Sequence, residues 1–214
     1  MPTKDTILLK TAHQVLEDEI RSLQKLNVLL DDRFEKACQF VMKCKGRVIF
    51  SGVGHSGHVA KKSAANMSSL NTPAYFLHAG EASHGDLGLV QKEDVMILIS
   101  NSGETAEVLA MMPQLKRMGV KSIAIVGNIN SSLAQVCDVA LPHGADEEAG
   151  PFKFAGSSSA LNSMALCDAL IMAVAASQGF SEQSYLNFHP GGAVGEKLKE
   201  KYTKLNPKNE KNRT

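Results

Sequence analysis

Apolar residues recur every three or four positions along the first 45 residues of the chain. This spacing predicts amphipathic helix from about residue 6 to residue 45. The series comprises Leu9, Ala12, Leu16, Ile20, Leu23, Leu26, Leu30 and Phe34. Asp31 and Asp32 are residues that cap helix N-termini, and they mark a start for a second helix. We expect residues 1–45 to form a helical segment that packs either on its own domain or on a partner subunit.

From residue 46 onwards, short apolar runs alternate with longer helical patterns. Five runs predict strands, and they lie at residues 47–50, 74–77, 95–99, 123–126 and 139–141. A long apolar helix is predicted from Ser157 to about Gln178, ending at Gly179. Apolar strands that alternate with helices indicate a parallel sheet covered on both faces. We therefore expect an α/β fold over residues 46–198: a three-layer α-β-α sandwich with a five-stranded parallel sheet in flavodoxin-like order.

The remaining residues, 199–214, are polar and carry no periodicity, so they predict a frayed tail. The amino-acid composition of the whole chain disfavours some classes of binding partner. Lys and Arg exceed Asp and Glu by 23 to 22, Trp is absent, and aromatic residues make up 5% of the chain. This balance disfavours a nucleic-acid partner or a polybasic membrane binder. No run of 18 apolar residues and no N-terminal signal core are present, so we expect no membrane partner and a cytoplasmic location.

Two loops leave predicted strands with the same chemistry. Ser51–Gly57 reads SGVGHSG and Ser100–Thr105 reads SNSGET. Each combines hydroxyls, glycine and a following helix N-terminus, which together can cradle a phosphate. Ordinary N-capping by Ser and Thr is the alternative. The first loop also matches the dinucleotide-binding pattern GxGxxG, but the acidic residue expected about twenty positions later is missing.

Six acidic or imidazole side chains are candidates for acid–base chemistry or ligand binding: His55, His78, His84, Glu104, Glu148 and His189. His55 lies within the first cradle and Glu104 beside the second. Taken alone, Glu104 could simply favour a helix N-terminus, and Glu148 could be a solvated loop charge. His189 lies in FHPGGAVG, where Pro190 and two glycines predict a tight backbone path.

Five segments together resemble one known family. They read GVGHSGH, GEASHGDLG, SNSGE, EEAGP and HPGGAVGEKL, in chain order between about residues 40 and 200. SNSGE is typical of sugar isomerase (SIS) domains in general. The full set resembles the D-arabinose-5-phosphate isomerases of the KpsF/GutQ type, in a short form that lacks CBS domains. The resemblance implies interconversion of D-ribulose 5-phosphate and D-arabinose 5-phosphate without a cofactor, for the synthesis of Kdo, an acidic sugar of lipopolysaccharide and capsules.

The resemblance also implies roles for individual residues. The catalytic positions fall on His55, Glu104, Glu148 and His189. The substrate-binding positions fall on Ser56, Thr72, His78, His84, Ser100, Asn101, Ser102 and Thr105. No metal is required, although His78 matches a histidine that can hold an adventitious zinc. SIS sites are commonly built between subunits, so the resemblance implies a homo-oligomer, a tetramer.

An aldose–ketose isomerase needs a carbon base, a group that moves a proton at oxygen, and a phosphate anchor. We assign Glu148 as the base, His189 as the proton-transfer or ring-opening group, and Ser56, Ser100, Ser102 and Thr105 as the anchor. Glu104 and His55 would position or polarise the sugar.

Two departures from the family pattern matter. His55 stands where the family usually has lysine, a fixed cation at neutral pH. The CBS pair of many relatives is absent, so we expect any regulation to act on the SIS domain itself, with the pathway product CMP-Kdo as a feedback ligand. One alternative function is a non-catalytic regulator that binds a sugar phosphate or CMP-Kdo. Another is an isomerase for a different sugar phosphate, against which HPGGAVG argues.

Overall fold

The computed structural model describes residues 4–189 and 191–205. Fifteen elements occur in this part of the chain, and α/β alternation begins at β1. They are α1 Lys4–Val28, α2 Asp32–Met42, β1 Val48–Gly52, α3 Gly54–Ser69, β2 Ala74–His78, α4 Ala79–Ala82, the 3-10 helix η1 Asp86–Leu89, β3 Val95–Ser100, α5 Ala106–Met118, β4 Lys121–Val126, α6 Ser132–Val136, β5 Val139–Pro142, α7 Ser158–Ser177, α8 Glu182–Phe188 and α9 Gly192–Leu205.

The five strands form one parallel sheet in the order β2-β1-β3-β4-β5. The predicted sandwich and its flavodoxin-like order are confirmed. Alternate side chains of each strand enter two separate cores, because successive residues point to opposite faces. Phe50, Ile97 and Ile125 pack on one face, while Ile49, Met96 and Ala124 pack on the other.

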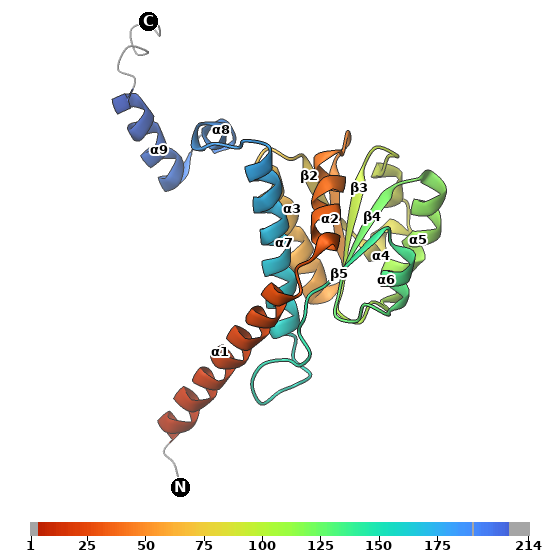
Figure 1. The fold of residues 1–214 in the computed structure, drawn as a ribbon, viewed down its shortest axis with the longest axis vertical. Helices are drawn as coiled ribbons and strands as arrows, with labels where there is room; N and C mark the ends of the chain where they lie inside the picture. The colour runs from red at the N-terminus through yellow and green to blue at the C-terminus, as the bar shows by residue number, and fades with distance from the viewer. Residues whose placement is uncertain (1–3, 190, 206–214) are drawn as a thin grey trace, which may run out of the picture.

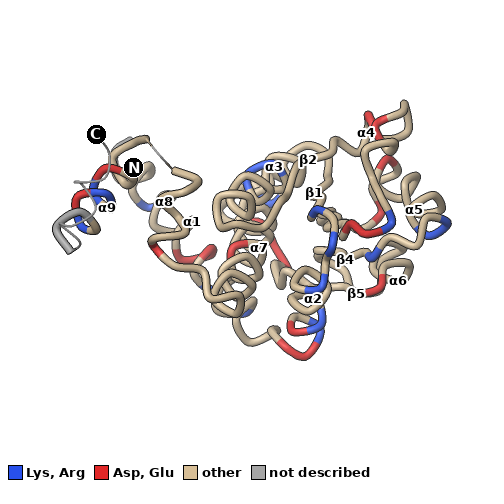
Figure 2. Tube along the Cα trace, turned by 90° about the horizontal axis from the view of Figure 1, so that it is seen from above, with Lys and Arg blue, Asp and Glu red and all other residues tan. Residues whose placement is uncertain are grey.

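Helices cover both faces of this sheet. Figure 2 shows α2, α3 and α7 on one side of the strands and α4, α5 and α6 on the other. The chain changes face between β1 and β3, since β1 leads into α3 and β3 leads into α5. In such sheets the crevice at the carboxyl ends of the two diverging strands is the usual ligand site. The fold therefore predicts a ligand site at the loops after β1 and β3.

The N-terminal helical segment divides where the sequence predicted a second start. Asp31 is the N-cap of α2, and its side chain accepts a hydrogen bond from the backbone N–H of Arg33. The C-terminal part of α1 packs against α7, while its N-terminal part projects from the domain (Figure 1). Leu9, Leu16 and Ile20 are more than half exposed along α1.

Helix α7 is the one helix in residues 4–189 and 191–205 with the length and apolarity of a membrane span. Half of that window is buried inside the domain, and Leu166, Leu170 and Val174 belong to the core on one face of the sheet. These side chains make α7 a core helix of the sandwich.

The structure of residues 199–205 differs from the predicted frayed tail. Helix α9 continues to Leu205, so residues 199–205 are helical rather than frayed, and residues 206–214 lie outside the described part of the chain. The physical reason is local: this stretch is rich in helix-forming Lys, Glu and Leu, and Lys201 and Tyr202 both bond Glu182 of α8. Together α8 and α9 form an arm that projects beyond the C-terminal end of α7 (Figure 1).

Candidate functional site

A small polar cavity of about 200 Å³ lies at the carboxyl ends of β1 and β3. Drug-sized ligands occupy pockets of about 300–1,000 Å³, so this cavity suits a smaller molecule. Four of the predicted site residues line it: His55, Ser56, Asn101 and Glu148. Its remaining walls are Val53, Val59, Phe154, Gly156, Ser159, Ala160 and Ser163.

The loop after β1 brings His55 and Ser56 into the first turn of α3. Val53 is the N-cap of this 16-residue helix and makes no side-chain cap hydrogen bond. The capping explanation for the hydroxyls of this loop therefore does not apply here. The first N–H groups of α3 face an uncapped end whose partial positive charge attracts anions.

The loop after β3 carries the second hydroxyl cluster. Ser100 Oγ and Thr105 Oγ1 are 2.7 Å apart, and Ser100 Oγ also accepts the Gly103 N–H at 3.0 Å. Gly103 adopts φ +70°, and a Cβ there would collide with Ser131 Oγ, so the loop requires glycine at this position. Thr105 is the N-cap of α5 but makes no side-chain cap bond, leaving a second uncapped helix end beside the first.

Glu148 is the most heavily hydrogen-bonded carboxylate of the site. Its oxygens accept from the backbone N–H groups of Ser157 (2.7 Å) and Ser159 (3.1 Å) and from both serine hydroxyls. Glu148 thus caps α7 from a distance in sequence. Burial raises the pKa of this carboxyl, but the hydrogen bonds from Ser159 and Ser157 outweigh burial and hold the pKa below its usual value.

Asn101 is joined to a residue that the sequence analysis missed. The Nε2 of His143, just after β5, is 3.0 Å from Asn101 Oδ1. His143 is completely buried, and burial lowers its pKa to about 4 against the opposing influence of Glu148. Neither a motif nor periodicity marks His143, because its importance comes from the adjacency of β4 and β5 to β3.

Besides Ser100, Ser102 and Thr105 of the loop after β3, four more predicted residues lie outside the lining of this cavity. Glu104 is exposed and accepts the Ser132 N–H at 2.8 Å, which lowers its pKa and makes it a cap for α6. His78 and His84 are exposed in the segment after β2, and His78 Nδ1 accepts the Gly80 N–H. Thr72 precedes β2 and therefore lies at the amino-terminal edge of the sheet, opposite the cavity.

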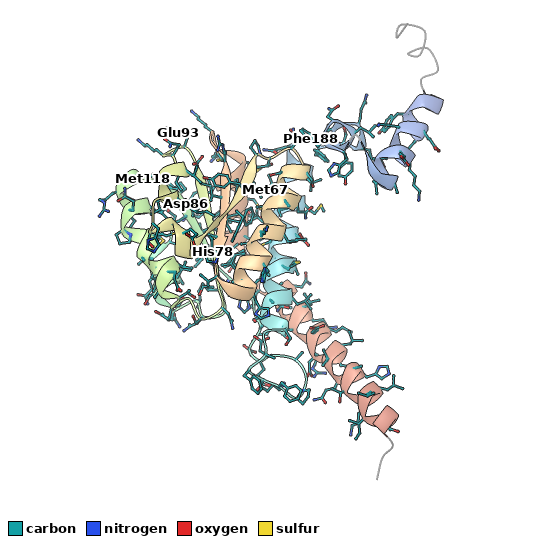
Figure 3. The ribbon with its side chains drawn as sticks, turned by 180° about the vertical axis from the view of Figure 1, so that it is seen from behind. Met67, His78, Asp86, Glu93, Met118 and Phe188 are labelled. Carbon is teal, nitrogen blue, oxygen red and sulfur yellow. The ribbon has the colours of Figure 1, made fainter. Side chains whose placement is uncertain are left out.

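His189 also lies apart from the cavity. It follows α8, and its ring stacks on Tyr185 with centroids 3.7 Å apart. The 20-residue helix α7 separates it from Ser157 and Glu148, and 20 residues span about 30 Å. In Figure 3, Phe188 lies on the projecting arm, well away from His78 at the carboxyl end of β2. A single copy of the chain does not bring His189 to Glu148.

A second cavity, of about 320 Å³, lies on the other side of Glu148 between α1 and the loop after β5. Its charged walls pair with one another: Lys25 with Asp146, Arg21 with Asp18, and Lys153 with Glu147. We place the functional site in the smaller cavity, because its lining joins His55 and Ser56 of the uncapped first turn of α3 to Asn101, which follows β3.

Comparison with known proteins identifies the family of the chain. The SIS domain family matches residues 41–173, which includes the sheet, the cavity and most of α7. The chain belongs to the SIS-domain family. The match confirms the resemblance to SIS domains that the SNSGE loop indicated.

Several relatives share sequence with this SIS chain. Arabinose 5-phosphate isomerase KdsD of Francisella tularensis is 42% identical over 193 residues, covering 89% of this chain and 59% of the relative. KdsD of Escherichia coli K12 is 43% identical over 185 residues, covering 86% of this chain and 56% of the relative. The chain therefore spans less than two thirds of these curated relatives.

A solved protein of E. coli strain CFT073, in complex with arabinose 5-phosphate, matches over its whole length. It is 37% identical, has a TM-score of 0.83, and covers 89% of this SIS chain. Phosphoheptose isomerase of Neisseria gonorrhoeae shares 19% identity and a TM-score of 0.65, which is a likeness of fold alone.

Proposed function

We propose that the chain is an aldose–ketose isomerase that interconverts D-ribulose 5-phosphate and D-arabinose 5-phosphate. The observation that carries the proposal is the shared cavity of Glu148, His55, Ser56 and Asn101 at the strand ends. Relatives that are 42–43% identical bear the name of this activity, and a 37% identical protein binds arabinose 5-phosphate.

The reaction needs no oxidant, because it only relocates protons. From D-ribulose 5-phosphate, a base removes a proton from C1, and the resulting enediol is protonated at C2. A proton also moves from the C1 oxygen to the C2 oxygen. The site must therefore supply a base, a proton carrier at oxygen and an anchor that holds the phosphate away from both.

We assign the anchor to Ser56, Ser100, Ser102 and Thr105. The uncapped N-termini of α3 and α5 support this, since their free N–H groups attract an anion. The Ser100–Thr105 hydroxyl pair uses one of its two protons in the mutual bond. The other proton remains for a ligand oxygen.

We assign the carbon base to Glu148. A carbon base works best with a pKa near the working pH, whereas the donors on Glu148 lower its pKa. Glu148 can therefore act as the base only if it gives up some of these hydrogen bonds. The hydroxyls of Ser157 and Ser159 turn from Glu148 to sugar oxygens when substrate enters. Losing two donors would raise the basicity of the carboxylate at the moment it is needed.

We assign oxygen proton transfer to His189 of a second copy of the chain, and a positioning role to His55 and Glu104. The distance along α7 supports an intersubunit site, and so do the projecting arm and the exposed apolar face of α1. This implies a homo-oligomer, for which we propose a tetramer. The reaction would take place in the cytoplasm and supply Kdo synthesis for lipopolysaccharide or capsule, with CMP-Kdo as a feedback ligand.

The second candidate is a non-catalytic regulator that binds the same sugar phosphate. The low pKa of Glu148 and the presence of His55 favour it, because both weaken proton abstraction. NMR spectroscopy of the purified protein with D-ribulose 5-phosphate separates the two. Appearance of D-arabinose 5-phosphate supports the isomerase. Thermal stabilisation by the sugar without turnover supports the regulator.

A further inference from the structure

The side-chain amide of Asn101 is hydrogen-bonded to the buried ring of His143. The two ring nitrogens of His143 have different partners. Nδ1 lies 3.3 Å from the backbone nitrogen of Ala145, and Nε2 lies 3.0 Å from Asn101 Oδ1. A backbone N–H can only donate, so Nδ1 must be the unprotonated nitrogen. The proton of the neutral ring therefore resides on Nε2.

The tautomer of His143 decides the orientation of the Asn101 amide. Nε2–H donates, so the atom facing it must be the amide oxygen of Asn101. The amide nitrogen then faces away from His143. Within residues 4–189 and 191–205, no protein group accepts a hydrogen bond from Asn101 Nδ2, and Asn101 lines the cavity. The amide nitrogen of Asn101 thus keeps two N–H donors for a ligand at the wall of the cavity.

Neighbouring elements pack closely around Asn101 and His143. Gly127 follows β4, and its N–H donates to the Asn101 carbonyl at 2.9 Å. A Cβ on Gly127 would lie 2.7 Å from Asn101 Oδ1 and 3.1 Å from His143 Nε2. Asn162 of α7 donates to the His143 carbonyl at 2.8 Å and to Ser22 of α1. The backbone carbonyls of both residues of the pair are therefore hydrogen-bonded to neighbouring elements.

We propose that His143 is a positioning residue, which fixes the Asn101 amide so that its N–H groups donate to an anionic or hydroxyl oxygen of the sugar phosphate. This inference rests on the proposed function, which supplies the ligand. His143 itself does not touch the substrate. Its effect passes through Asn101, so loss of His143 should matter only while the Asn101 amide is present.

A double-mutant cycle tests this dependence. The variants are His143→Leu, Asn101→Ala and the double variant, each measured for the KM and kcat of isomerisation and for the Kd of D-arabinose 5-phosphate by calorimetry. A hydrogen bond to a charged group contributes about 1.5–3 kcal/mol, so Asn101→Ala should weaken binding roughly 10- to 100-fold. His143→Leu should weaken it about tenfold in the native background and not at all in the Asn101→Ala background.

Three further variants separate positioning from stability. His143→Gln keeps an N–H donor for Asn101 Oδ1 and should restore most of the affinity. Val120→Ala shortens a buried side chain just before β4, at the amino-terminal ends of the strands and away from the cavity. This variant should lower thermal stability without changing KM. Gly127→Ala should mimic His143→Leu, because the new Cβ displaces the pair while both side chains remain.

Each outcome decides a different question. Coupled losses of affinity without any turnover would leave the positioning role in place and reject the isomerase. Turnover with equal effects of His143→Leu in both backgrounds would reject the positioning role and leave the isomerase. Failure of the native protein to bind D-arabinose 5-phosphate at millimolar concentration would reject both.

Discussion

Ser159 donates both its backbone N–H and its hydroxyl to the carboxylate of Glu148, so the first turn of α7 is capped by a side chain from the preceding loop. An anionic cap of this kind interacts favourably with the helix dipole. The N-caps of α3 and α5, by contrast, make no side-chain cap hydrogen bond, so the first N–H groups of these two helices are left for an anionic ligand. In the proposed site we therefore expect the phosphate of the ligand near α3 and α5 and its sugar near Glu148.

Replacing Glu148 tests the assigned base. Glu148→Gln should lower kcat by about 10²–10⁴-fold, the usual contribution of a general base, while the Kd of D-arabinose 5-phosphate changes little. The melting temperature should also fall, because α7 loses its charged cap. Glu147→Gln is the matched control, since the neighbouring carboxylate is exposed and bonds Lys153 instead. Full turnover in Glu148→Gln would remove Glu148 from this role.

His55 offers a direct test of the missing lysine. A lysine carries a fixed charge at neutral pH, whereas an ordinary imidazole is mostly neutral. His55→Lys should therefore raise kcat/KM for D-ribulose 5-phosphate, measured by coupled assay or NMR. His58→Lys adds the same charge one turn later, at an exposed position outside the cavity. An equal change in both variants would mean that the effect is only one of net charge.

The position of His189 predicts complementation between inactive variants. Glu148→Gln and His189→Ala should each be inactive alone, because each removes one half of the proposed intersubunit site. Co-expressed, they should form hybrid oligomers in which some sites hold both native residues, and part of the activity should return. Light scattering on the native protein gives the required control. A monomer, or hybrids that stay inactive, would contradict an intersubunit site.

The buried ring of His143 predicts how stability depends on pH. Its pKa is lowered from 6.5 to about 4 in the folded state, so the unfolded chain binds the extra proton between these values. The free energy of unfolding should therefore fall as the pH drops from 6.5 to 4, by roughly 3 kcal/mol for this one group. Above pH 6.5 the contribution should be constant.

Urea titrations across this pH range measure that slope. His143→Gln cannot take up a proton, so its unfolding free energy should vary less between pH 6.5 and pH 4 than that of the native protein. Identical slopes in the two proteins would assign the pH dependence to other groups.

Much of the fold follows from short stretches of sequence. The apolar runs near residues 48, 95 and 123 are short, rich in Val and Ile and without polar alternation, which predicts strands buried on both faces. The anion-binding chemistry of the loops after β1 and β3 can be predicted from local sequence, because their glycines and hydroxyl residues are contiguous in the sequence. His55, Ser56, Asn101 and Glu148 were identified in this way or through family motifs.

Other features depend on contacts between distant segments. The family resemblance named Thr72 and Glu104 as site residues, whereas only the tertiary structure shows that Thr72 lies at the amino-terminal ends of the strands and that Glu104 bonds Ser132, 28 positions away. His143 carries no local signal, since its bond to Asn101 spans 42 positions. Likewise, only the length of α7 separates His189 from Glu148. Hydrophobic periodicity determined the layers of this protein, whereas the tertiary structure decided which polar groups meet, because hydrogen bonding requires a proximity that periodicity does not encode.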